Sequence, residues 1–163
     1  MNEYLFSGES VIEKKGANFL LFLDEHGLPR FGLFGHNPQM LLNGLPEKTE
    51  SIGGHLYLTN FRLFFWSHRF NRFKGTFSIF LPNIIEATDV SQPLTLSKMM
   101  QVVTLDHKFE FVVWKIPKLI VAINAARNSI SSVQIEELQN AVRNSPEKYG
   151  DGFNINPLVM DSL

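Results

Sequence analysis

The chain has 163 residues, of which 44% are hydrophobic and 15 are phenylalanine. That length fits one domain, and the hydrophobic share is large enough to bury a core, which excludes a wholly disordered chain. The net charge is -1 at pH 7, from 15 basic and 16 acidic residues. Because the basic and acidic residues are nearly equal in number, the chain as a whole has no general attraction to nucleic acid or to an anionic membrane. Any such binding must come from a local patch.

The chain contains no cysteine. Disulfide bonds and cysteine-ligated zinc sites are therefore excluded, and the absence agrees with a reducing cytoplasm. The start, Met1-Asn2-Glu3-Tyr4, lacks the basic and apolar character of a signal peptide. The longest apolar runs, at 19–23 and 119–123, have five residues each, whereas a membrane-spanning helix needs about 20. We therefore expect a cytoplasmic domain, peripheral to membranes if it meets them at all, without a transmembrane segment.

Residues 10–23 are predicted to form an opening strand or a pair of strands, broken at Lys14-Lys15-Gly16. Its apolar and aromatic end, 19–23, is typical of a core strand. Residues 24–54 contain six glycines and three prolines. So many glycines and prolines predict a long loop or insertion, with or without a short strand at 31–34.

The middle of the chain predicts a series of strands. Residues 55–59 and 61–67 read as two strands joined at Thr59-Asn60, where asparagine tolerates turn geometry. Phe77, Ile79 and Leu81 follow the period of two that a half-buried strand requires. Later strands are predicted at residues 84–90, 99–105 and 108–114, the last two forming a hairpin around Asp106-His107.

After Trp114 the apolar residues change to helical spacing. A first helix carries Ile116, Leu119, Ile120, Ile123 and Ile130, with Pro117 acceptable in its first turn. Ser131 and Gln134 can form a capping box that opens a second helix. Strands followed by helices predict an antiparallel barrel or sandwich of about seven strands, closed at one end by the first helix.

We therefore expect one domain over residues 1–145, in which 24–54 is a loop or insertion and 131–145 is the second helix. Residues 146–163 contain glycine, asparagine and proline without a sustained period. They are predicted to form a tail that either docks on the domain or stays loose.

Residues 54–65, which read Gly-His-Leu-Tyr-Leu-Thr-Asn-Phe-Arg-Leu-Phe-Phe, resemble the central motif of GRAM domains. In that family a strand ending in Leu-Thr is followed by a turn residue, an aromatic residue, an arginine and an apolar strand. Residues 77–87 and the hairpin at 99–114 are similar to later strands of the family. The resemblance implies a mainly β, pleckstrin-homology-like antiparallel barrel with a C-terminal helix, and a role linked to membrane phosphoinositides. The layout is also similar to the GRAM region of WW-domain-binding proteins, but the chain has no Pro-Pro-X-Tyr motif for a WW partner.

The best candidate binding segment is residues 66–75, a predicted loop in which cations alternate with aromatic residues. Arg69, Arg72 and Lys74 can contact phosphate groups, and Phe70 and Phe73 can enter the headgroup boundary of a membrane. Each cation near an anionic surface contributes about 1 kcal/mol. The alternatives are that the phenylalanines fold back onto the barrel above solvated cations, or that the loop meets a protein partner.

Lys14 and Lys15 are a second candidate, because the sequence places them in an early turn between strands. In related lipid-binding barrels such a turn often supplies phosphate contacts. A solvated hairpin tip that carries two lysines is the simpler reading.

No pattern for catalysis is present. The glycines lack the Gly-X-Gly-X-X-Gly and Gly-Lys-Ser/Thr spacings, the histidines lack HExxH, and no Gly-X-Ser-X-Gly elbow frames a serine. We therefore predict a non-catalytic recruitment module without cofactor, metal or nucleic-acid partner, which recognises a membrane phosphoinositide or another anionic lipid. The alternative is a protein-interaction module without a lipid ligand, using the loop at 32–35 and the helix face at 133–142.

Overall fold

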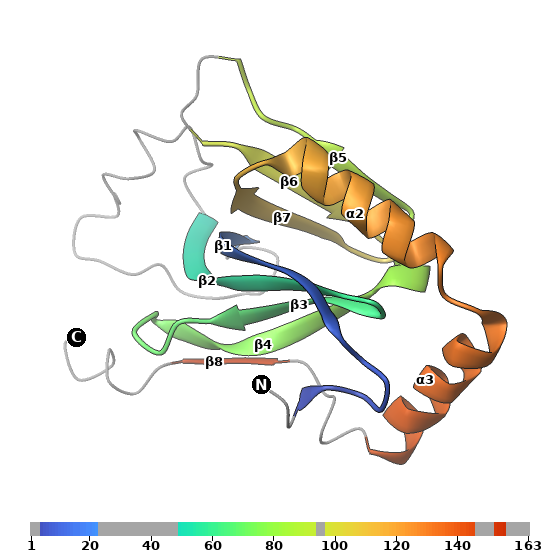
Figure 1. Cartoon of the computed structure of the whole chain (residues 1–163). Coiled ribbons are helices and arrows are strands. Elements are labelled where there is room, and N and C mark those ends of the chain that lie inside the picture. Colours follow the sequence, from blue (N-terminus) through green and yellow to red (C-terminus); the bar gives the residue numbers. More distant parts are fainter. Residues whose placement is uncertain (1–3, 23–48, 94–96, 146–151, 156–163) are drawn as a thin grey trace.

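The computed structural model of the chain describes residues 4–22, 49–93 and 97–145, and the backbone of residues 152–155. In these residues the strands form one antiparallel sheet of eight strands, with order β5-β6-β7-β1-β2-β3-β4-β8 (Figure 1). The elements are β1 (Val11–Phe22), β2 (Thr49–Thr59), β3 (Arg62–Ser67), β4 (Phe73–Phe80), the 3-10 helix η3 (Leu81–Asn83), β5 (Glu86–Asp89), β6 (Met99–Val103), β7 (Lys108–Val113), α2 (Ile116–Asn128), α3 (Ser132–Asn144) and β8 (Gly152–Ile155).

The inner face of the sheet carries an aromatic core. The Phe19 ring of β1 lies 4.7 Å from that of Phe77 on β4, 5.9 Å from Phe65 on β3 and 5.7 Å from Phe111 on β7, measured between centroids. Tilted contacts at these distances are the arrangement that aromatic pairs favour. Four residues of the segments predicted as strands at 55–59 and 61–67 also belong to this buried cluster: Leu56, Leu58, Leu63 and Phe65.

Helix α2 packs against this core, alongside β5 to β7 in Figure 1. Its buried residues, Ile116, Leu119, Ile123 and Ala126, recur at the spacing of one helix face. Near its end the Arg127 guanidinium donates to the Ile84 carbonyl oxygen, with 2.7 Å between the two atoms. The predicted class, mainly antiparallel β with C-terminal helices, is therefore confirmed, and the arrangement is consistent with a pleckstrin-homology-like fold.

Helix α3 begins at the predicted capping box. The Ser131 hydroxyl accepts from the Gln134 N–H, and the Gln134 side-chain oxygen accepts from the Ser131 N–H. Leu138 of α3 is buried in a second, smaller cluster with Phe6 and Phe61, so α3 lies beside the start of the described chain (Figure 1). This second cluster attaches α3 to the domain from outside the main core.

Arg62 fixes the segment before β1 to the outer face of the sheet. Its guanidinium donates to both carboxylate oxygens of Glu9, at 2.9 and 3.1 Å, and to the Ser78 hydroxyl at 2.8 Å, and it also donates to the Tyr4 carbonyl. The rings of Phe6 and Phe64 each lie 4.7 Å from the same group. The arginine of the GRAM-like motif is thus a buried structural residue, only 2% exposed.

Two predicted strand boundaries are wrong. Residues 10–23 are not interrupted at Lys14-Lys15-Gly16, because β1 is continuous and pairs with β2 from Val11 to Phe22. Strand β2 begins at Thr49, inside the predicted insertion.

Glycine at 54 is needed in the strand, because a Cβ there would lie 2.4 Å from the Trp66 carbonyl oxygen and 2.6 Å from the Phe65 ring.

The tail contributes one strand. Residues 152–155 pair with the start of β4, between Phe73↔Ile155 and Thr76↔Gly152, so this part of the tail docks on the sheet. The predicted short strand at 31–34 and the partner loop at 32–35 lie outside the described residues.

Candidate functional site

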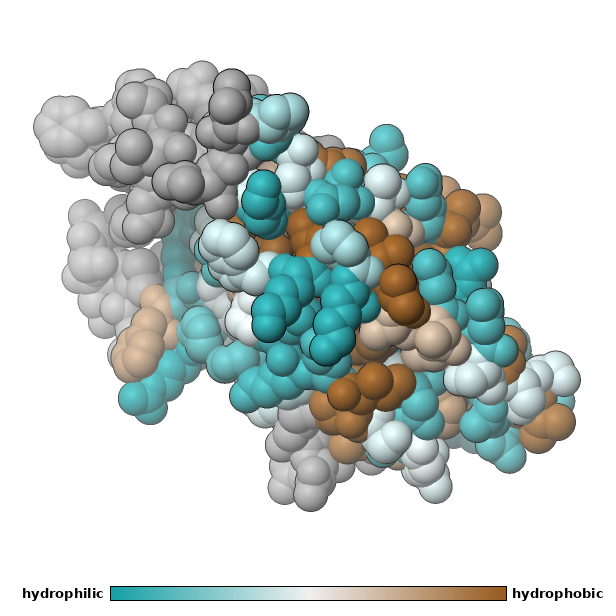
Figure 2. Space-filling view, turned by 45° about the horizontal axis from the view of Figure 1, so that its top comes forward, coloured by the Kyte–Doolittle hydropathy of each residue, from teal (hydrophilic) through white to brown (hydrophobic). Residues whose placement is uncertain are grey.

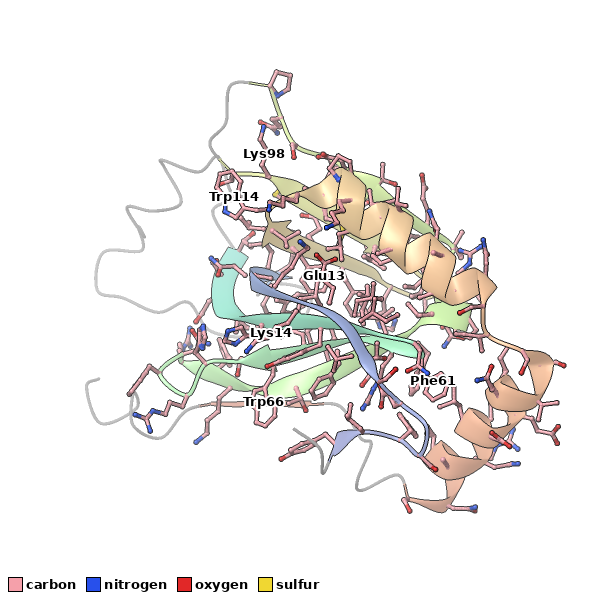
Figure 3. All side chains as sticks on the ribbon, in the orientation of Figure 1. Glu13, Lys14, Phe61, Trp66, Lys98 and Trp114 are labelled. Carbon is pink, nitrogen blue, oxygen red and sulfur yellow. The ribbon has the colours of Figure 1, made fainter. Side chains whose placement is uncertain are left out.

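The candidate site is the outer surface of β1 and β2 together with the turn at residues 68–72. We call its members, Lys14, His55, His68, Arg69 and Phe70, the basic face. Strand register places them together: Lys14 is opposite Tyr57, and His55 is opposite both Gly16 and Trp66. Because paired residues of neighbouring strands point to the same side, Lys14, His55 and Trp66 share the outer surface, on which Figure 3 labels Lys14 and Trp66.

The turn is anchored to β2 at one carbonyl. Gly53 O accepts from the His68 N–H at 2.9 Å and from the Asn71 side-chain amide at 2.6 Å. The same amide also donates to the His68 carbonyl, at 3.1 Å. These bonds close the turn on itself and hold His68 against the strand, so the site has a fixed backbone.

The tip of the turn projects Arg69 and Phe70. The Phe70 side chain is 72% exposed, and the Arg69 guanidinium lies 4.6 Å from the centre of its ring. A cation over an aromatic face at this distance is attracted to the ring. The pair therefore presents an apolar surface and a positive charge together.

Three basic side chains meet behind this tip. The Lys14 ammonium lies 5.3 Å from the centre of the Tyr57 ring, and the imidazole rings of His55 and His68 lie 5.0 Å apart and nearly perpendicular. Burial lowers the pKa of His55, and the charges of Lys14 and His68 lower that pKa further. The cluster therefore resists taking up a further positive charge while it has no anion beside it.

The other predicted site residues lie elsewhere. The prediction that Phe73 is an exposed wedge is wrong, because Phe73 belongs to β4 and is 2% exposed in the main core. Arg72 pairs with Glu50 at 3.0 Å, in a half-buried contact where burial raises the pKa of Glu50 against the opposing effect of Arg72. Lys74 follows Phe73 in the half-buried first part of β4.

The two lysines of β1 do not act as one group. Lys14 is opposite Tyr57 of the outer surface, whereas Lys15 is opposite the core residue Leu56. Lys15 also pairs with Glu13, at 3.0 Å. Only Lys14 joins the basic face, because successive residues of a continuous strand point to opposite sides.

Sequence reasoning missed both histidines of the site, for which it noted only that an HExxH pattern is absent. The available signal was His55 two residues before Tyr57 in a predicted strand, and His68 directly before the arginine-rich segment. Their approach depends on the pairing of β2 with β3, which a linear reading does not provide.

Large exposed hydrophobic side chains also lie away from the basic face, among them Leu105, Trp114 and Val121. In the view of Figure 2, hydrophilic side chains gather at the centre of the face and separate hydrophobic groups lie around them. Exposure alone therefore does not single out Phe70, and its cationic surroundings distinguish it from Leu105.

Neither a metal site nor a membrane-spanning helix is present among the described residues. They contain no group of three or more histidine, aspartate or glutamate side chains placed to hold a metal ion. None of the helices described is long and apolar enough to cross a membrane.

No protein-family model matches the chain, and no curated protein matches it in sequence. Among solved structures it is similar to the C-terminal domain of an unknown protein from Leishmania infantum, with 13% identity over 76% of this chain and 88% of that chain, and a TM-score of 0.49. A likeness of this size supports no statement about function.

Proposed function

We propose that this chain is a non-catalytic recruitment module of the cytoplasmic membrane surface, which binds the phosphate groups of anionic lipids through the basic face. The observation that carries the proposal is the tip of the turn, where Phe70 is 72% exposed and Arg69 lies 4.6 Å from its ring. An exposed ring can enter the boundary between headgroups and acyl chains while the guanidinium meets a phosphate. The resemblance to GRAM domains agrees with this role.

The energies favour reversible attachment. Full burial of a phenylalanine contributes about 1.5–3 kcal/mol, and each cation near an anionic surface contributes about 1 kcal/mol. With Lys14 and Arg69 as the permanent cations of the basic face, the sum is that of a weak peripheral contact. Such a contact releases when the lipid composition or the salt concentration changes.

Vesicle sedimentation tests the proposal. The chain should sediment with phosphatidylcholine vesicles that contain a phosphatidylinositol phosphate, and less so as salt is added. Arg69→Ala should weaken the salt-sensitive part of binding, whereas Phe70→Ala should weaken binding at every salt concentration because burial of the ring is not electrostatic. Leu105→Ala is the matched control, since Leu105 is 88% exposed at the β6–β7 turn without a role in the site. Absence of sedimentation at low salt at every pH would overturn the proposal.

A second candidate function, binding of a protein segment, is favoured by a groove between η3 and α3. The groove has a volume of about 400 Å³ and is lined mainly by Phe80, Pro82, Ile135, Leu138 and Val142. A photo-crosslinking side chain at Gln139, on its rim, should then give a discrete adduct in cell extract. The same side chain at exposed Asn124 of α2 should not.

A further inference from the structure

Three of the basic side chains of the basic face, Lys14, His55 and His68, have no carboxylate partner among the described residues. Lys14 comes from β1, His55 from β2 and His68 from the end of β3. Their contacts are with aromatic rings: Lys14 with Tyr57, His55 with Tyr57 and His68. The two acidic residues nearest along the strands are engaged elsewhere, Glu13 with Lys15 and Glu50 with Arg72.

The groups that face the histidines come from three places. The charge of Lys14 acts on His55 from β1, the Tyr57 ring lies 6.1 Å from the His55 ring on β2, and Arg69 follows His68 directly in the turn. Lysine and arginine side chains are positively charged near neutral pH, and tyrosine side chains are uncharged. Protonation of His55 and His68 therefore adds like charges to an already positive surface.

The strand beside His55 leaves room for a ligand. Gly16 is opposite His55 on β1, and a Cβ built at Gly16 meets no atom of the described residues within 4 Å. The space lies two residues from Lys14 on the same side of β1. On the far side, the Asn71 amide donates to the carbonyl oxygens of Gly53 and His68, which holds the backbone of His68 beside β2. The open space is thus bordered by an ammonium and two imidazoles on fixed backbone.

We propose that Lys14, His55 and His68 form a proton-dependent binding site for a phosphate monoester. The inference rests on the proposed function in one respect, that the phosphate belongs to a lipid headgroup; a free phosphate has the same chemistry. A phosphate dianion would supply the missing negative charge and accept from the ammonium and from imidazolium N–H groups. Such charge-assisted bonds are stronger than those between neutral groups.

The site couples binding to proton uptake. The anion favours the charged form of both imidazoles, so by linkage it raises their pKa, and protonation tightens binding in return. The affinity for the phosphate should rise about tenfold per pH unit for each proton taken up. This rise occurs as the pH falls through the range in which histidine side chains gain a proton. Below about pH 6 the phosphate monoester itself loses its second negative charge. Affinity should therefore pass through a maximum close to that pH.

The first measurement uses the full chain and inorganic phosphate. Histidine ring resonances are followed by NMR through a pH titration, with and without phosphate at constant ionic strength. Phosphate should raise the pKa of His55 and of His68 and leave that of His107, an exposed histidine of the β6–β7 turn, unchanged. Equal small effects on all three histidines would show general ion screening and would overturn the inference.

The second measurement compares vesicles. Binding to phosphatidylcholine vesicles with a phosphatidylinositol phosphate should strengthen from about pH 8 to about pH 6.5, where histidine gains its charge. His55→Gln and His68→Gln should each reduce this pH response, and Gly16→Glu, which places a carboxylate in the open space, should abolish it. His107→Gln is the control. The titration is continued to about pH 5, below the pH at which the monoester loses its second charge. Vesicles with phosphatidylserine in place of the phosphoinositide then separate a phosphate monoester site from attraction to any anionic surface, since only the former should show the maximum.

The outcomes separate the two proposals. Vesicle binding that is independent of pH overturns the proton-dependent site and leaves the recruitment function intact. Phosphate-specific shifts of both histidines without vesicle binding support a site for free phosphate and overturn the lipid function. Absence of both effects overturns both.

Discussion

The buried ion pair between Arg62 and Glu9 gives the sharpest test of how the domain is held together. We expect Glu9→Gln to destabilise the fold by about 3–5 kcal/mol, the usual effect of removing one partner from a buried pair. The glutamine keeps the shape of the side chain but leaves a guanidinium that is 2% exposed without its counter-charge. Against a total stability of about 5–15 kcal/mol, this loss is large.

The magnitude follows from the contacts that depend on the carboxylate. Its oxygens accept two hydrogen bonds from Arg62 and one from the Phe6 N–H at 2.8 Å. A glutamine amide supplies one acceptor and turns an N–H₂ group toward donors, so at least one buried donor is left unpaired. The loss also weakens the attachment of Phe6, which α3 uses in the second cluster.

Urea unfolding of the full chain measures the effect. Glu9→Gln should lower the midpoint with little change of slope, and Glu136→Gln, on the exposed side of α3, should stay within about 0.5 kcal/mol of the parent. The double variant Glu9→Gln/Arg62→Met should recover part of the loss, because it removes the unpaired charge as well. A loss below about 1 kcal/mol in Glu9→Gln would place the pair in the range of solvent-exposed ion pairs and refute the reasoning.

Three further predictions concern the core, a glycine and a carboxylate. Leu63→Ala should cost about 2–5 kcal/mol in urea unfolding, since Leu63 is fully buried in the main core; an unchanged midpoint would show that β3 is wrongly placed. Gly54→Ala should cost about 1–3 kcal/mol in the same assay, because its Cβ would meet Trp66 O at 2.4 Å, and an unaffected midpoint would contradict that close approach. Hydrogen bonds from the Ser91 hydroxyl and amide hold the pKa of Asp89 below its ordinary 3.8, so they contribute stability that is lost as the pH falls through the lowered value. Ser91→Ala should therefore raise the Asp89 pKa in a carboxyl NMR titration, and an unchanged value would exclude Ser91 as the cause.

The fold class and most of the helices and strands could be predicted from the sequence. Period-two alternation at Phe77 and Ile79 predicted the inner face of β4, because a strand with one buried side must repeat its apolar residues at every second position. The change to helical spacing after Trp114 predicted α2, and Ser131 with Gln134 predicted the start of α3 through bonds between neighbours in the chain. These signals are local, so they can be read without knowing which segments meet.

Elements and contacts that depend on pairing over long distances in the chain could be known only from the folded structure. Lys14-Lys15-Gly16 resembles a turn, yet the ladder with β2 keeps these residues extended. The glycine at 54 resembles a loop residue, yet β2 requires it because β3 passes too close for a side chain. The same holds for the site: alternation with Arg72 suggested that Phe73 is exposed, but its place on the inner face of β4 buries it. His55 and His68 stand 13 positions apart in the sequence and meet because β2 and β3 are antiparallel neighbours. Cross-strand proximity is set by register, and register depends on how the whole sheet buries its core.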